Sequence, residues 1–132
     1  MSSFEAGDPI APFVIDAVST EAMKEWAVFL ADPNPIHLDP EAVKAKGLGD
    51  KVINQGPINV AYMMNMLMTA FPGCSIKQIE ARFLDNVYGG DKAVASGTIR
   101  SVEGNRIECE IALEVDGRGV VNAGTAVVLL NS

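Results

Sequence analysis

The segment 57–70 constrains the fold more than any other part of this chain, because it is apolar on nearly every side. It reads Pro-Ile-Asn-Val-Ala-Tyr-Met-Met-Asn-Met-Leu-Met-Thr-Ala and contains no charged residue. A helix of this kind is expected to be enclosed by protein on most sides, and it is too short to span a bilayer. Pro57 favours a helix start, and the Pro72-Gly73 pair favours a stop. We therefore predict a central helix against which the rest of the chain packs.

The chain after this helix has the pattern of antiparallel strands. Apolar side chains recur at every second position from Ile107 to Val115, which is the spacing of a half-buried strand. The Gly104-Asn105 pair is a hairpin signal. The pattern predicts strands over residues 79–87, 92–102, 107–115 and 120–130, after an irregular first strand within 10–17. Helical segments followed by a meander of strands describe an α+β protein in which an antiparallel sheet wraps a central helix.

Composition limits the classes of partner. With 132 residues, the chain is the size of one domain, and we expect residues 1–132 to form a single domain. A net charge of -7 argues against binding nucleic acid or an anionic membrane surface. Two cysteines and one histidine, at no metal-binding spacing, give no expectation of a metal site. The N-terminal segment 1–5 lacks the regions of a signal peptide, so we expect a cytoplasmic protein.

Two shorter helices are predicted upstream, joined by the proline-rich stretch 32–37. Ser19 or Thr20 can cap the first of these helices. The Asp39-Pro40 pair has the pattern of a helix cap followed by a first helical residue. Prolines at two positions of the stretch 32–37 restrict both their own backbone and that of the residues before them. The stretch should therefore be stiff, which suits side chains that must be held in a fixed geometry.

This stiff stretch carries the only histidine in the sequence, His37, together with Asp32. A carboxylate and an imidazole held close together can act as a general acid and base. Gly56 directly precedes the start of the apolar helix, so its backbone N–H is expected at a helix N-terminus, where donors are unpaired and negative charge is favoured. The sequence therefore offers an acid/base pair and a position for a developing oxyanion.

Segment 32–37, Asp-Pro-Asn-Pro-Ile-His, resembles the Gly-Asp-x-Asn-Pro-x-His signature of the MaoC-like dehydratases and R-specific enoyl-CoA hydratases. The resemblance is close over residues 29–67. It extends more weakly to residues 82–91, which look like the family's Arg-Phe-x-x-Pro-Val-x-x-Gly-Asp strand and turn. Together these segments cover about half of the chain. The resemblance implies the hot-dog fold, normally a dimer whose two sheets join.

The resemblance also implies roles for individual residues. Asp32 and His37 match the aspartate and histidine that activate a water, and Gly56 matches the glycine whose N–H binds the thioester oxygen. Gln55 and Asn34 are further candidates for contact with substrate, although Asn34 is expected chiefly to brace the loop. No cofactor is implied.

The sequence departs from the family pattern near this site at Ala31, at Gln55 and at Pro57-Ile58, which replaces the usual Met-Leu. Ala31 replaces the usual glycine before the aspartate, a change that costs little if its backbone torsions are ordinary. Gln55 replaces the histidine that commonly precedes the oxyanion glycine. With Asn54 and Asn59, Gln55 places amides near the expected site, and we hypothesise a substrate with a polar acyl group.

These observations predict a hydro-lyase that reversibly hydrates a trans-2-enoyl-CoA to the R-3-hydroxyacyl-CoA. Dehydration of an acyl-carrier-protein thioester uses the same chemistry and stays open. The expected assembly is a homodimer. Two alternatives also stay open: a hot-dog acyl-CoA thioesterase, and a non-catalytic acyl-CoA-binding subunit of a heteromeric dehydratase. The presence of both Asp32 and His37 favours the hydro-lyase over the non-catalytic subunit.

Overall fold

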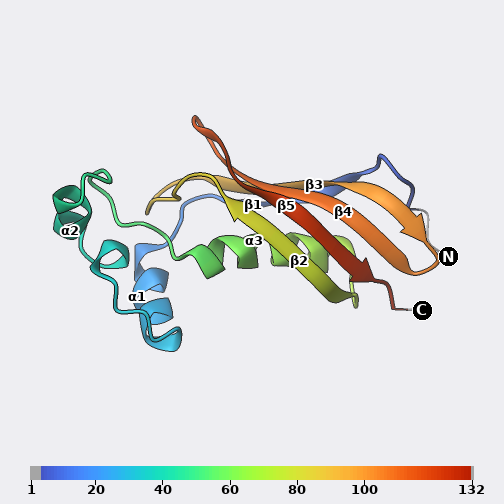
Figure 1. Cartoon of the computed structure of the whole chain (residues 1–132), viewed down its shortest axis with the longest axis horizontal. Coiled ribbons are helices and arrows are strands. Elements are labelled where there is room, and N and C mark those ends of the chain that lie inside the picture. The colour runs from blue at the N-terminus through green and yellow to red at the C-terminus, as the bar shows by residue number, and fades with distance from the viewer. Residues whose placement is uncertain (1–3, 132) are drawn as a thin grey trace.

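The computed structural model describes residues 4–131, in which one five-stranded sheet is joined to four helical segments (Figure 1). Residues 1–3 and 132 lie outside the described part. They include most of segment 1–5, which was considered above as a possible signal peptide, and both ends of the expected domain 1–132. The strands run in the order β1-β3-β4-β5-β2, and every neighbouring pair is antiparallel. Their bounds are β1 (Pro9–Ile15), β2 (Ser75–Phe83), β3 (Ala93–Glu103), β4 (Arg106–Val115) and β5 (Gly119–Leu129). The predicted α+β class and antiparallel sheet are confirmed.

The predicted strand ends need small corrections. The first predicted strand after the helix, 79–87, forms earlier, as β2, and ends at Phe83, so Val87 lies in the turn beyond it. The strand β1 is an edge strand with an irregular register between Ile10 and Phe13, as its prolines predict. Strand ends depend on pairing with distant neighbours, which the local pattern does not contain.

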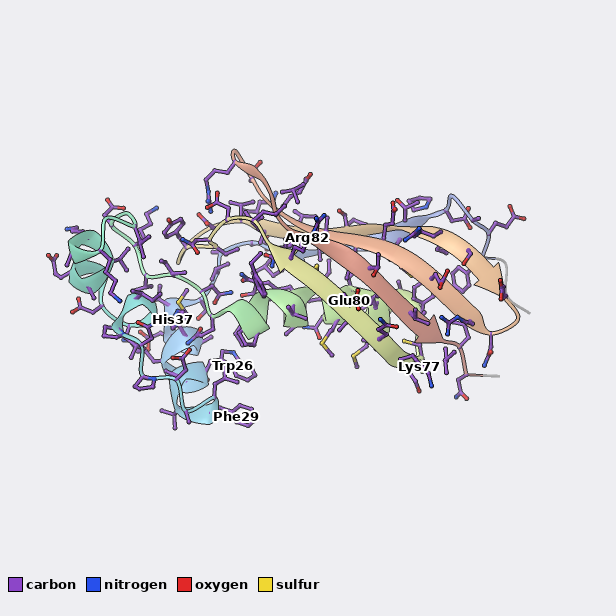
Figure 2. The ribbon with its side chains drawn as sticks, in the orientation of Figure 1. Trp26, Phe29, His37, Lys77, Glu80 and Arg82 are labelled. Atoms are coloured by element: carbon purple, nitrogen blue, oxygen red, sulfur yellow. The ribbon has the colours of Figure 1, made fainter. Side chains whose placement is uncertain are left out.

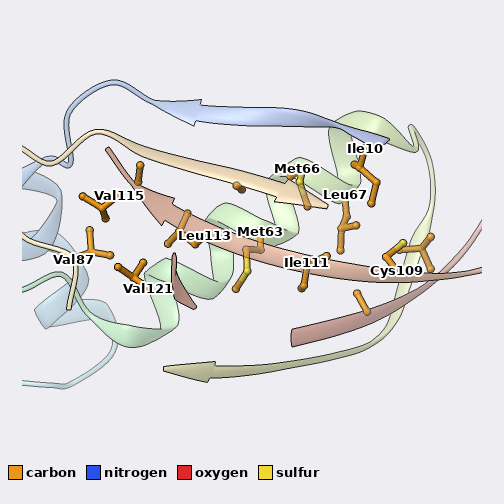
Figure 3. Close-up of a cluster of buried hydrophobic side chains, with 14 of the residues drawn as sticks. Ile10, Met63, Met66, Leu67, Val87, Cys109, Ile111, Leu113, Val115 and Val121 are labelled. Atoms are coloured by element: carbon orange, nitrogen blue, oxygen red, sulfur yellow. The ribbon is translucent and has the colours of Figure 1, made fainter. Parts of the chain in front are cut away.

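The helix α3 (Gly56–Ala70) lies along one face of the sheet and contacts β1, β2, β3 and β4. Met63, Met66 and Leu67 are fully buried between this helix and the sheet (Figure 3). The alternating residues of β4 complete the same layer, and all are buried: Ile107, Cys109, Ile111, Leu113 and Val115. Complete burial of a large apolar side chain contributes about 1.5–3 kcal/mol, so this layer is the main source of folding stability.

The expectation that α3 is enclosed on most sides is only partly met. Its sheet-facing side is buried, but Pro57, Asn65 and Thr69 are exposed, and Met68 is 54% exposed. A single sheet can cover only one side of a helix. The apolar sequence of α3 therefore exceeds what the packing within one chain requires.

A helical extension, residues 20–55, lies beyond one end of the sheet (Figures 1 and 2). It contains α1 (Thr20–Phe29), the short 3-10 helix η1 (Pro35–His37) and α2 (Pro40–Ala45). The Ser19 hydroxyl accepts a hydrogen bond from the Ala22 N–H, and Asp39 caps α2, as predicted. Trp26 and Phe29, both labelled in Figure 2, meet edge to face with ring centroids 5.4 Å apart. Among the described residues, no helix is long and apolar enough to cross a membrane.

The extension is fixed to the sheet through the turn 87–91. The Asn54 N–H donates to the Val87 carbonyl at 2.7 Å, and the Gly89 N–H donates to the Val52 carbonyl at 2.9 Å. A Cβ at Gly89 would lie 2.5 Å from a methyl carbon of Thr20, so only glycine allows this close approach. These contacts hold the segment just before α3, and the start of α1, against the turn 87–91.

Candidate active site

His37 is held by a single strong backbone contact. Its Nδ1 lies 2.6 Å from the carbonyl oxygen of Ile53, and the Ile53 N–H donates to the Ile36 carbonyl at 2.8 Å. Because a carbonyl oxygen only accepts hydrogen bonds, Nδ1 must carry a proton. In the neutral imidazole, Nε2 is then an unprotonated base. The side chain is 9% exposed, so the ring has little freedom to reorient.

Asp32 faces this free nitrogen. Its Oδ2 lies 3.5 Å from His37 Nε2, and its side chain is 41% exposed. This separation is longer than the roughly 2.7–2.9 Å of a direct charge-assisted hydrogen bond. The Asp32 Oδ1 accepts from the Asn34 N–H at 3.3 Å, which fixes the other oxygen. Two hydrogen-bond acceptors, one buried and one open to solvent, therefore face each other across the gap.

Asn34 braces the loop between these side chains, and Ala31, which precedes Asp32, has an unusual backbone torsion. The Asn34 side chain accepts from the Ile36 N–H at 3.3 Å and caps η1, so it braces the loop. Ala31, however, has φ +51°, in the left-handed region. Alanine was expected to cost little here only if its backbone torsions were ordinary, and they are not. A side chain disfavours the left-handed region by about 1–2 kcal/mol. The tight reversal between α1 and Asp32 requires this torsion.

Gly56 is the first residue of α3, one position earlier than predicted. Gln55 is the N-cap and makes no side-chain capping bond, so the backbone N–H groups of the first turn have no side-chain cap. Gly56 is three residues from Ile53, which holds the imidazole, so their Cα atoms are at most about 11 Å apart. The helix start therefore lies three residues along the chain from the carbonyl that holds the His37 ring.

An apolar groove begins at Gly56. It is lined by Gly56, Pro57, Val60, Met64 and Phe83 and has a volume of about 620 Å³. That volume is within the range of small-molecule sites. A Cβ built on Gly56 would lie 3.2 Å from the Phe83 ring, so the ring borders the helix start directly. Of the four clustered methionines of α3, Met64 lines this groove and Met63 and Met66 fill the core.

The amides predicted near the site are engaged in different ways. Asn54 Nδ2 donates to Asn59 Oδ1 at 2.9 Å and to the Tyr62 hydroxyl at 3.2 Å. Burial raises the pKa of Tyr62, and the hydrogen bond from Asn54 partly offsets the rise. Gln55 Nε2 donates to the Met23 carbonyl at 2.8 Å, whereas its buried Oε1 has no partner in the described chain. Asn54 and Asn59 therefore support the helix start by bonding to each other.

Sequence reasoning missed Asn122, a fully buried amide on β5. Neither its Oδ1 nor its Nδ2 has a hydrogen-bond partner among the described residues. The signal was available in the pattern, since an asparagine inside an otherwise apolar strand is unusual.

Comparison with known proteins shows the family and the fold. The family model described as the MaoC like domain matches residues 5–118. The structure is similar to the (R)-hydratase from A. caviae involved in PHA biosynthesis, with a TM-score of 0.90 and 21% identity over 99% of this chain and 100% of that one. It is also similar to the R-hydratase PhaJ1 from Pseudomonas aeruginosa, with a TM-score of 0.86 and 20% identity over 98% and 83% of the two chains.

A third solved structure extends the likeness to a two-subunit enzyme. It is the C-terminally truncated HadBC (3R-hydroxyacyl-ACP dehydratase) complex from Mycobacterium tuberculosis, with a TM-score of 0.79 and 17% identity over 98% of this chain and 100% of that one. No curated protein sequence matches this chain. These likenesses establish the hot-dog fold. Because the family model spans most of the sequence and includes both the proline-rich stretch and the start of α3, the chain belongs to the MaoC-like dehydratase family.

Proposed function

We propose that this protein is a hydro-lyase that reversibly adds water to a trans-2-enoyl-CoA and gives the R-3-hydroxyacyl-CoA. One observation carries the proposal: Nε2 of His37 and Oδ2 of Asp32 face each other across 3.5 Å, with Nδ1 held by the Ile53 carbonyl. The names of the structurally similar R-hydratases agree with this reaction and with its R stereochemistry.

The pair suits the activation of water because both groups accept hydrogen bonds. A water bound beside the pair donates one O–H to Nε2 and the other to Oδ2, so its lone pairs point away from both. The water oxygen then forms a bond to C3 of the enoyl thioester while one proton passes to the pair. A proton returned to C2 completes the addition. Acid and base groups of this kind contribute about 10²–10⁴-fold to a rate.

The start of α3 would bind the other end of the reacting system. Addition at C3 moves negative charge onto the thioester oxygen, and the Gly56 N–H at the helix N-terminus can donate to it. The groove that begins at Gly56 would hold the acyl chain. Asn34 would act by bracing the loop, and Gln55 by fixing the helix start against α1 through its bond to the Met23 carbonyl.

We propose a homodimer as the assembly and the cytoplasm as its location. Within the described chain, β2 pairs with β5 alone, so its outer edge is free to pair with a second sheet. Lys77, Glu80 and Arg82 lie along this strand (Figure 2). The HadBC complex has a similar fold and is named as a 3R-hydroxyacyl-ACP dehydratase complex. Two alternatives for this protein therefore stay open: a substrate on acyl carrier protein, and an assembly with a second type of subunit.

The test follows the loss of enoyl-thioester absorbance when the purified protein is mixed with trans-2-enoyl-CoA of several chain lengths. Hydration to the R-product, identified by chiral analysis, is expected. Release of free thiol from saturated acyl-CoA would instead identify a thioesterase. Binding of acyl-CoA without turnover, followed by activity only with a second subunit, would replace the stand-alone hydratase with the subunit alternative.

A further inference from the structure

Arg118 lies in the turn between β4 and β5, at the end of the sheet next to the helical extension (Figure 1). Its guanidinium bonds to two carboxylates: Nη1 lies 3.1 Å from Asp85 Oδ2, and Nη2 lies 2.6 Å from Asp91 Oδ2. Nη2 also donates to the Asn86 carbonyl at 2.9 Å. One side chain therefore joins the two ends of the segment 85–91, which leads from β2 to β3.

These bonds form a network and not an isolated surface pair. Asp91 Oδ2 accepts a second hydrogen bond, from the Tyr88 N–H at 2.8 Å, and the guanidinium carbon lies 5.0 Å from the centre of the Tyr88 ring. The Asp91 side chain is 18% exposed and that of Arg118 is 32% exposed. Exposed ion pairs contribute little singly, but networks with good geometry are the exception. Because two carboxylates already face one guanidinium, Arg118 is suited to holding this turn and not to binding an anionic ligand.

The turn 87–91 in turn holds the segment 52–54. The Asn54 N–H donates to the Val87 carbonyl at 2.7 Å, and the Gly89 N–H donates to the Val52 carbonyl at 2.9 Å. The residues between them, Ile53 and Tyr88, form an antiparallel β-bridge. Segment 52–54 is therefore paired with the turn as a short strand is paired with its neighbour.

Ile53 directs its own backbone groups to the other side of this short strand. Successive residues of an antiparallel strand alternate between bonding and not bonding to the same neighbour. Ile53 accordingly bonds to the proline-rich stretch: its N–H donates to the Ile36 carbonyl at 2.8 Å, and its carbonyl lies 2.6 Å from His37 Nδ1. A displacement of the turn would therefore displace the carbonyl that fixes the tautomer of the His37 ring.

We propose that Arg118 is a positioning residue for the hydration reaction: through the turn 87–91 and Ile53, it holds the His37 ring with Nδ1 protonated and Nε2 free. The inference rests on the proposed function, because that function gives the ring its part in the reaction. Arg118 does not contact the substrate in this account. Its loss should therefore reduce turnover, leave substrate binding nearly unchanged, and allow the ring to populate the tautomer that is protonated on Nε2.

The first test observes the tautomer directly. His37 is the only histidine in the sequence, so protein without a histidine tag gives unambiguous ring signals. Long-range ¹H–¹⁵N correlation spectra at mildly alkaline pH, where an ordinary imidazole is neutral, distinguish the two tautomers. The wild type should show the Nδ1–H form alone, and Arg118→Ala should add a second set of signals from the Nε2–H form. Arg106→Ala is the matched control, since it breaks an ion pair with Glu108 at the opposite end of the sheet, and it should match the wild type.

The second test separates turnover from binding. Arg118→Ala should lower kcat by about ten- to a hundredfold, because a small displacement that begins far from the reacting atoms can cost this much. KM should stay within about twofold, as expected when no substrate contact is lost. Arg118→Lys keeps the positive charge but lacks the planar group that reaches both carboxylates, so its kcat should be intermediate. Arg106→Ala should leave both constants unchanged.

The outcomes separate this inference from the proposed reaction. Signals of the Nδ1–H form alone in Arg118→Ala overturn the inference, whatever happens to kcat. If the wild type hydrates nothing, the spectra still decide the role of Arg118, because they need no substrate. A second set of signals with unchanged kcat and KM would support the hold on the ring and remove the ring from the proposed reaction. Should Arg118→Ala fail to fold, Arg118→Lys is measured in the same way, and wild-type spectra from it overturn the inference.

Discussion

The helical extension and the sheet with α3 differ in which side chains they bury and which they expose. In the sheet and α3, the buried side chains are almost all apolar, and the core residues of β4 and α3 are at most a few per cent exposed. In the extension, the large apolar residues Val28 and Phe29 are 83% and 79% exposed. The extension also carries Asp32, His37 and the left-handed Ala31.

This contrast teaches where substitutions should affect activity and where they should affect stability. Functional side chains are commonly placed on irregular segments that a rigid scaffold positions. The proline-rich stretch is such a segment, and the backbone of Ile53 holds it by bonding to the Ile36 carbonyl and to the His37 ring. Changes to its side chains should therefore reduce turnover with little effect on folding, while changes in the core should do the reverse.

The largest expected effect is on turnover in the extension. Asp32→Asn and His37→Ala should each lower kcat for enoyl-thioester hydration by about 10²–10⁴-fold, because the first replaces the carboxylate by a neutral, non-basic amide and the second removes the imidazole. Steady-state kinetics with circular dichroism melts provides the measurement. Asp39→Asn is the matched control in the same segment, since asparagine also caps a helix. Full activity in either active-site variant would remove the pair from the mechanism.

The second-largest effect on turnover is expected at Gly56, where the helical extension meets α3. Gly56→Pro removes the N–H at the first helical position, where proline is well tolerated, and Gln55 already has the extended backbone that precedes proline. The expected loss in kcat is about 10²–10³-fold, as for other oxyanion donors.

Gly56→Ala is the control for that variant because it adds a Cβ beside Phe83 but keeps the N–H. Its turnover should stay close to that of the wild type. Equal losses in Gly56→Ala and Gly56→Pro would show that crowding against the ring, and not the missing donor, is responsible.

A third prediction concerns the core. Burial raises the pKa of Cys109 from 9.0 to about 11, and the nearby Cys74 adds to the rise. The folded thiol stays protonated between these values while the unfolded thiol ionises, so folding stability is complete below pH 9 and is lost as the pH rises through 11. The expected loss is about 2–3 kcal/mol in the free energy of unfolding.

Urea unfolding at pH 8, 9.5 and 11 measures this loss against Cys109→Ala. The variant should be less stable than the wild type at pH 8, since it leaves space in the core. The difference should shrink toward pH 11. A constant difference across this range would contradict the assigned ionisation.

The smallest effect returns to the extension. Ala31→Gly should raise the free energy of unfolding by about 0.5–1 kcal/mol, because relief of the left-handed torsion outweighs the greater freedom of glycine in the unfolded chain. Thermal melts provide the measurement, and Ala42→Gly inside α2 should instead destabilise by about 0.5–1 kcal/mol. A less stable Ala31→Gly variant would show that the alanine side chain supports the reversal.

Local pattern predicted most of the elements because the relevant physics is local. The alternation in β4, the hairpin at Gly104 and the caps at Ser19 and Asp39 depend on neighbours a few residues away. The torsion of Ala31 was not predictable in this way, since it follows from how α1 meets the loop. Asn122 was missed because its isolation depends on strands that pair from distant parts of the chain.

By itself, the sequence determined the fold class, the central helix and the identity of a candidate acid/base pair, because periodicity, prolines and a single histidine are properties of short segments. Only the tertiary structure decided what these residues face. The backbone of Ile53 fixes the His37 tautomer, and Asn54 and Asn59 satisfy each other. The pairing of β5 with β2 leaves Asn122 buried beside Phe83 without a partner. Hydrogen bonds and burial join residues that are far apart in the chain, and such contacts exist only once the whole chain is folded.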